Sequence, residues 1–138
     1  MAFNLSKYFT SNKPLRPLII AEVSANHCGK KTLFLKSIIS AAKNGADLIK
    51  IQTYEASDIT INKSFNIKNW NNKKIWDLYS KAQTPYSWHR DAFALAKKLK
   101  IELFSSPFSE RAVDFLQTFA ERVPLFQYTL QLILKSRN

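Results

Sequence analysis

The sequence has few of the residues from which disulfides, zinc sites and nucleotide-binding loops are built. Cys28 is the only cysteine, so an internal disulfide is impossible and cysteine-rich zinc sites are excluded. A single cysteine also suits a reducing compartment. Gly29 and Gly45 are the only glycines, and the chain therefore lacks the Gly-rich phosphate loop of dinucleotide-binding folds.

Long apolar runs and acidic residues are also scarce. No window approaches the ~20 apolar residues of a membrane span, and the opening stretch "MAFNLSKYFTSNKPLRP" has no signal-peptide core. We therefore expect a cytoplasmic protein without a membrane partner. With 21 Lys and Arg against 10 Asp and Glu, the net charge is +11, which favours anionic ligands. The lysines lack the arginine clusters and interleaved aromatics of a nucleic-acid module, so we expect no nucleic-acid partner.

What the sequence does contain is an alternation of strand and helix patterns. With 46% hydrophobic residues, 138 residues are enough for one domain or a piece of one. Short apolar runs typical of buried strands occur at 18–23, 46–54 and 101–108. The polar stretch 55–74 is long enough to indicate a functional or disordered loop. This spacing predicts an α/β fold with parallel strands joined by right-handed crossovers.

Helical periodicity fills the intervals between these strands. A helix after Gly29 should end near Gly45, a favoured C-terminal cap, with an apolar stripe of Leu35, Ile38, Ile39 and Ala42. A short helix follows the polar stretch, with Ile75, Leu78, Tyr79 and Ala82 on one side. The next begins with Thr84 as N-cap and Pro85 in the first helical position, and it buries Trp88, Ala92, Leu95, Ala96 and Leu99. Ser109 is the expected cap of the last helix.

Polar side chains gather where the predicted strands end. In parallel α/β architectures, ligands bind beyond the carboxyl ends of the strands. Glu22 lies at the end of the first strand. Lys50 and Gln52 share one side of the second strand because side chains alternate. Ser105 and Ser106 end the third strand next to a helix N-terminus, a usual phosphate seat.

Two of these groups have both a structural and a functional interpretation. A buried Glu22 is either an ion-pair partner for a lysine or a group poised for proton transfer. Lys50 either neutralises Glu22 or, with Gln52, forms a site for an anionic ligand that also carries hydroxyl or carbonyl groups. The two interpretations of Lys50 are compatible.

The histidines and the cysteine give weaker signals. His27 and Cys28 lack the further ligands of a metal site, so we expect His27 to form hydrogen bonds within its loop. Adjacent residues rarely point at one another, which argues against a Cys–His nucleophile pair. His89 follows Trp88 in a helix and is predicted to be a partly buried surface residue.

Four longer motifs resemble the N-terminal part of the sialic acid synthase family: "IIAEVSANHCGKK", "GADLIKIQTYEASDIT", "WDLYSKAQTPYSWHRDAFALAKKL" and "FSSPFSERAVDFL". The match covers roughly residues 14–119, with the motifs in the family's order. Within the family they are most like the pseudaminic acid synthases, with N-acetylneuraminate synthases as the alternative.

The resemblance implies the N-terminal part of a TIM (β/α)8 barrel and a condensation of phosphoenolpyruvate with an N-acetylated amino sugar. It also implies a divalent metal, Mn²⁺ or Mg²⁺, whose ligands are expected beyond this chain, and a homodimer for the full-length enzymes. By position, Glu22 corresponds to the catalytic acid/base and Lys50 to the lysine that holds phosphoenolpyruvate. Gln52 corresponds to a sugar-contacting glutamine, and Ser106 to a residue at the phosphate end of phosphoenolpyruvate.

The sequence departs from the family at two places. Cys28 stands where the family usually has Asn, and the likeness ends near residue 120, where an expected lysine and serine are absent. We therefore expect one partial barrel domain, 1–138, with three to four strand–helix units, family-like over 14–119 and divergent over 120–138, from a truncated or frameshifted gene. Uncovered apolar faces should make such a chain associate, with little catalysis alone. The alternative is a non-catalytic basic α/β module that binds an anion or a partner.

Overall fold

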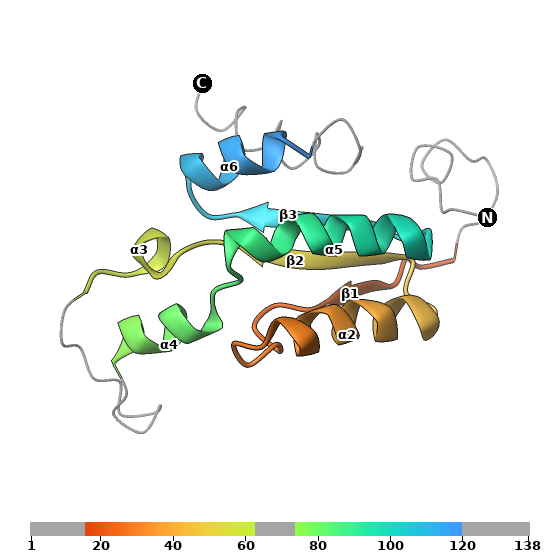
Figure 1. Ribbon diagram of the computed structural model, residues 1–138, viewed down its shortest axis with the longest axis horizontal. Helices are drawn as coiled ribbons and strands as arrows, with labels where there is room; N and C mark the ends of the chain where they lie inside the picture. The colour runs from red at the N-terminus through yellow and green to blue at the C-terminus, as the bar shows by residue number, and fades with distance from the viewer. Residues whose placement is uncertain (1–15, 63–73, 120–138) are drawn as a thin grey trace.

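The computed structural model describes residues 16–62 and 74–119, which contain one parallel sheet in the order β1-β2-β3 (Figure 1). The strands are β1 (Ile20–Glu22), β2 (Leu48–Thr53) and β3 (Glu102–Pro107). Each matches a predicted apolar run, and all three are parallel, which confirms the predicted α/β architecture. The predicted tail 120–138 and the middle of the polar stretch, 63–73, lie outside the described residues.

The described residues contain five helices: α2 (Lys31–Lys43), α3 (Ala56–Ile59), α4 (Ile75–Ala82), α5 (Tyr86–Leu99) and α6 (Glu110–Gln117). Four of them follow the predicted alternation, whereas α3 lies inside the polar stretch that was predicted to be a loop. In Figure 1, α2 and α5 lie side by side along one face of the sheet, and α3 and α4 lie beyond the carboxyl ends of the strands. Across 16–62 and 74–119, no helix combines the length and the apolar character needed to cross a bilayer.

The larger core cluster lies between the sheet and the two long helices, and a second, smaller cluster contains Leu48, Phe104 and Leu116 of α6. Ile49 and Ile51 of β2 are fully buried in the larger cluster, as is Phe34 of α2. The buried face of α2 is centred on Phe34 and Ile38, whereas Leu35 is only half-buried. The predicted stripe was therefore rotated by about one residue, because Phe34, the largest apolar side chain of this helix, takes the central position against the sheet.

The helix boundaries confirm two predicted caps and correct a third. Asn44 caps α2 and Gly45 follows with a φ of +88°, a left-handed conformation that glycine adopts without strain. The Ser109 hydroxyl accepts the Ala112 N–H at the start of α6. The prediction for Thr84 was wrong: Pro85 precedes the first residue of α5, and the buried Thr84 hydroxyl lies 3.3 Å from His27 Nε2 instead.

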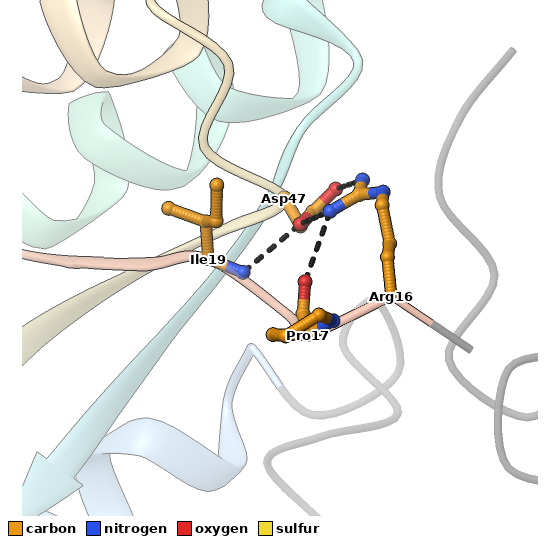
Figure 2. Close-up of polar contacts among 4 residues, drawn as sticks. All are labelled: Arg16, Pro17, Ile19 and Asp47. Atoms are coloured by element: carbon orange, nitrogen blue, oxygen red, sulfur yellow. Dashed lines mark hydrogen bonds and ion pairs between the residues drawn. The ribbon is translucent and has the colours of Figure 1, made fainter.

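At the amino end of the sheet, one carboxylate ties the incoming chain to β2 (Figure 2). Asp47 Oδ2 accepts hydrogen bonds from Arg16 Nη1 at 2.7 Å and from the Ile19 N–H at 3.0 Å, and Arg16 Nη2 binds Oδ1. The hydrogen-bonded Arg16 guanidinium, assisted by the Ile19 N–H, holds the pKa of Asp47 below its ordinary value. This contact fixes where β1 begins beside β2.

Candidate active site at the carboxyl ends of the strands

The four site residues predicted from sequence lie on the sheet face opposite α2 and α5. Ile49 and Ile51 point into the helix-covered core, so Lys50 and Gln52, which alternate with them, face the other way. The register pairs Glu22 with Lys50 and Gln52 with Ser106. Three strands thus bring a carboxylate, an ammonium, an amide and a hydroxyl to one surface.

Glu22 and Lys50 form an ion pair, as one of the sequence interpretations expected. Lys50 Nζ lies 2.7 Å from Glu22 Oε2, and Glu22 Oε1 accepts hydrogen bonds from the Ser24 hydroxyl at 2.8 Å and the Ser24 N–H at 3.2 Å. The side chains of Glu22 and Lys50 are 39% and 33% exposed. A dissolved anion can therefore reach the ammonium without opening the core.

The two serines at the end of β3 have different surroundings. Ser105 is fully buried and pairs with Ile51 in the register, on the helix-covered side of the sheet. Ser106 is half-buried and shares the open face with Gln52. The sequence interpretation that grouped the two hydroxyls at one phosphate seat therefore needs correction, since alternation leaves only Ser106 facing the site.

The loop after β1 is held by a buried histidine. His27 is 0% exposed, and its Nδ1 accepts the Gly29 N–H at 3.0 Å, which confirms the predicted hydrogen bonding within the loop. The ring packs edge-on against Phe34 and Trp88, and burial lowers its pKa. Because Nδ1 faces a donor and Nε2 faces Thr84, neither ring nitrogen activates the exposed Cys28.

His89 corrects another prediction, because it is completely buried rather than partly exposed. Its Nε2 lies 2.7 Å from the Thr53 hydroxyl, and desolvation lowers its pKa to about 4. The sequence does carry a signal for this burial: His89 precedes Ala92 by three residues and Ala96 by seven, on the apolar stripe of α5. The histidine is neutral at neutral pH and belongs to the core.

A second ionic cluster at the rim was not foreseen from sequence. Arg111 Nη2 of α6 lies 2.6 Å from Glu55 Oε2 and 3.9 Å from Asp58 Oδ1, and its guanidinium lies 5.5 Å from the centroid of the Tyr86 ring. Glu55 and Asp58 form a capping box around the first turn of α3. Arg111 thereby connects the segment after β2 to α5 and α6. A lone arginine in an amphipathic helix gives no signal for such a partner.

The described residues do not form a metal site. Within 16–62 and 74–119, no three His, Cys, Asp or Glu side chains converge as metal ligands would. Both histidines have their ring nitrogens committed to neighbours in the core.

Comparisons with known proteins identify relatives of this chain. The family model described as the NeuB family matches residues 37–127. The pseudaminic acid synthase of Campylobacter jejuni subsp. jejuni serotype O:2 is 46% identical over 113 residues, which cover 78% of this chain and 33% of that protein. The pseudaminic acid synthase of Helicobacter pylori is 41% identical over 107 residues, covering 74% of this chain and 32% of its own length.

A solved structure shares the fold. The N-acetylneuraminic acid (sialic acid) synthetase from Leptospira borgpetersenii serovar Hardjo-bovis, in complex with citrate, superposes with a TM-score of 0.60 at 27% identity. The superposition covers 75% of this chain and 33% of that structure. The chain thus spans about a third of the length of the relatives it matches. By the extent of the family match and the parallel strand–helix fold, the chain belongs to the NeuB family.

Proposed function

We propose that this chain forms the phosphoenolpyruvate-binding part of a nonulosonic acid synthase site of the pseudaminic acid synthase type. The observation that carries the proposal is the partly exposed Glu22–Lys50 ion pair, formed by the last residue of β1 and a residue in the middle of β2. The Lys50 ammonium is a third exposed and can bind an anion. The Glu22 carboxylate beside it lies close enough to exchange protons with the same ligand.

The proposed roles follow from where each side chain lies. Lys50 binds the anionic phosphoenolpyruvate, and Ser106, one strand away, hydrogen-bonds its phosphate end. Gln52, beside Ser106 in the register, contacts the sugar through its amide. Glu22 serves as the acid/base because it lies beside Lys50 and is open to solvent.

The reaction that these roles serve is a condensation. The enol carbon of phosphoenolpyruvate attacks the aldehyde carbon of the open-chain sugar, and a carbon–carbon bond forms. Water then adds to the resulting cationic carbon, and inorganic phosphate leaves with cleavage of its carbon–oxygen bond. Phosphoenolpyruvate, sugar and water thus give the sugar acid and phosphate, and Glu22 accepts and donates the protons that are transferred.

The sugar is assigned from the relatives. Two pseudaminic acid synthases are 41–46% identical to this chain, against 27% for the sialic acid synthetase structure. We therefore propose an N-acetylated amino sugar of the pseudaminic acid type as the partner of phosphoenolpyruvate. From the family resemblance we also propose that the full-length enzymes use a divalent metal, Mn²⁺ or Mg²⁺, whose ligands lie beyond this chain. Because phosphoenolpyruvate is an intracellular metabolite, we also propose that the protein is cytoplasmic.

Calorimetric titration of the purified chain with phosphoenolpyruvate tests the proposal. We expect saturable binding that weakens at least about tenfold in Lys50→Met, because the variant loses a charge-assisted contact worth roughly 1.5–3 kcal/mol. Lys36→Met is the matched control, since it removes the same charge from an exposed position on α2. Absence of binding by the unmodified chain, or equal binding by both variants, would contradict the proposal.

A phosphate-release assay separates binding from chemistry. With Mn²⁺ and the N-acetylated amino sugar present, any turnover should disappear in Glu22→Gln, while phosphoenolpyruvate binding stays within about threefold of the unmodified chain. Saturable binding of another protein without affinity for phosphoenolpyruvate would instead favour a non-catalytic module.

A further inference from the structure

A chain of three buried polar side chains lies behind the Gln52–Ser106 pair, on the helix-covered side of the sheet. Thr53, Ser105 and His89 are each 0% exposed. The Thr53 hydroxyl lies 2.7 Å from His89 Nε2 and 2.5 Å from the Ser105 hydroxyl. Burying polar groups costs free energy unless they are hydrogen-bonded, and a fully connected network of buried polar groups makes the surrounding core more rigid.

The surroundings of His89 determine the direction of these hydrogen bonds. His89 Nδ1 lies 3.2 Å from the Pro85 carbonyl oxygen, which can only accept, so Nδ1 carries the ring proton. In the neutral ring Nε2 then accepts from Thr53. Ser105 has one hydroxyl proton and two acceptors, Thr53 at 2.5 Å and the Ile51 carbonyl at 3.2 Å. The Thr53 contact is the shorter of the two, and it connects Ser105 through Thr53 to His89.

The register places this chain directly behind the candidate ligand contacts. Gln52 pairs with Ser106, and the hydroxyl bond joins the residue after Gln52 to the residue before Ser106. Because side chains alternate along a strand, the bond crosses from β2 to β3 on the opposite side of the same pair. His89 extends the connection to α5. Rotation or sliding of either strand end would break the bond.

We propose that Thr53, Ser105 and His89 are positioning residues, which hold Gln52 and Ser106 in the orientation that binds the ligand. This inference rests on the proposed function, because it takes Gln52 and Ser106 as ligand contacts. Strand ends joined by backbone pairing alone tolerate local rotation, whereas a site that handles a small phosphorylated acid needs its contacts held to a fraction of an ångström. The buried hydroxyl chain supplies that constraint without touching the ligand.

Paired substitutions at one position test the inference. Thr53→Val keeps the shape of the side chain and removes the hydroxyl, and Thr53→Ser returns the hydroxyl. The control is Thr84→Val, which removes another buried hydroxyl that faces the other buried histidine, His27. A general loss of core stability would affect both valine variants, whereas a positioning role belongs to Thr53 alone.

Two readouts are measured in each variant. The first is the NMR signals of the Gln52 side-chain amide and the Ser106 backbone amide in the free protein, and the second is the dissociation constant for phosphoenolpyruvate. In Thr53→Val we expect both amide signals to shift or broaden and binding to weaken about tenfold. Thr53→Ser should restore both readouts, and Thr84→Val should change neither.

The possible results separate this inference from the proposed function. If the unmodified chain does not bind phosphoenolpyruvate, the proposed function fails, and the amide signals alone decide the positioning role. Unchanged Gln52 and Ser106 signals in a folded Thr53→Val would overturn the inference.

Discussion

His89 and His27 are buried among apolar and aromatic side chains, and desolvation lowers the pKa of both. For His89 the folded-state pKa is about 4, below the ordinary 6.5. Between these two pH values, His89 is protonated in the unfolded chain and neutral in the folded chain. Stability is therefore fully present above pH 6.5 and falls as the pH is lowered towards 4.

We expect this titration to remove about 3 kcal/mol from the free energy of unfolding between pH 7 and pH 4. Urea unfolding at a series of pH values measures it, and His89→Gln should show a visibly shallower acid slope than the unmodified chain. His27→Gln serves as the comparison, because it leaves the contribution of His89 in place. Parallel slopes for the unmodified chain and His89→Gln would contradict the assignment.

Asp47 gives a second prediction for a single residue. Its carboxylate accepts hydrogen bonds from Arg16 and from the Ile19 N–H, so Asp47→Ala should cost roughly 1–2 kcal/mol of stability. Asp91→Ala is the control, because its ion pair with Lys31 is about half exposed and should contribute under about 0.5 kcal/mol. Equal losses in thermal or urea unfolding would show that the Asp47 contact is no stronger than an ordinary surface ion pair.

At the scale of elements, α6 depends on its cap. The Ser109 hydroxyl accepts the Ala112 N–H, one of the N–H groups that a helix start leaves without a carbonyl partner. Ser109→Ala should therefore destabilise the fold by about 1 kcal/mol. In Ser37→Ala the lost hydroxyl only donates to the Leu33 carbonyl within α2, and we expect a change below about 0.5 kcal/mol. A Ser109→Ala variant as stable as the control would argue against the cap.

Every strand and every helix except the short α3 could be predicted, because each has a strong local pattern. Three apolar runs and the cap at Ser109 are visible without knowledge of the neighbours. The rotated face of α2 could not be predicted, because Phe34 and Leu35 are both apolar and only the packing against the sheet selects between them. Thr84 was assigned to a cap because a Thr–Pro pair favours one, whereas His27, 57 residues away in sequence, binds its hydroxyl.

In the candidate site, too, features set by neighbouring residues in the sequence could be predicted, whereas contacts between distant residues could not. Alternation alone put Lys50 and Gln52 on one side of β2, and the structure brings Glu22 to Lys50. The roles of these residues stay a prediction. The contact of Arg111 with Glu55 and the buried bond from Thr53 to Ser105 each join residues more than 50 positions apart. Only the register of the sheet and the docking of α6 could reveal such contacts.

At the scale of the whole molecule, apolar side chains remain exposed at the start of β1. Ile19 is 57% exposed and Ile20 47%, and among the described residues β1 is an edge strand. Exposed apolar strand edges favour pairing with further chains. We therefore propose that the purified chain self-associates through this edge.

Sedimentation velocity over a range of concentrations tests the association. Ile19→Lys should raise the concentration at half-association by roughly tenfold, because it replaces an apolar contact worth about 1.5 kcal/mol with a charge. Leu33→Lys, on α2 and 38% exposed, adds the same charge elsewhere and should have a smaller effect. Monomeric behaviour of the unmodified chain at all concentrations would contradict this proposal.

The position of Asp47 has a consequence for how such a protein can evolve. Asp47 secures the sheet at its amino end, whereas Glu22, Lys50, Gln52 and Ser106 lie further along the strands. Mutations at the two ends are therefore subject to different selection, for persistence of the fold at one and for the choice of ligand at the other. Under the proposed function, a lineage could exchange its sugar through mutations near the site while inheriting the same anchored sheet.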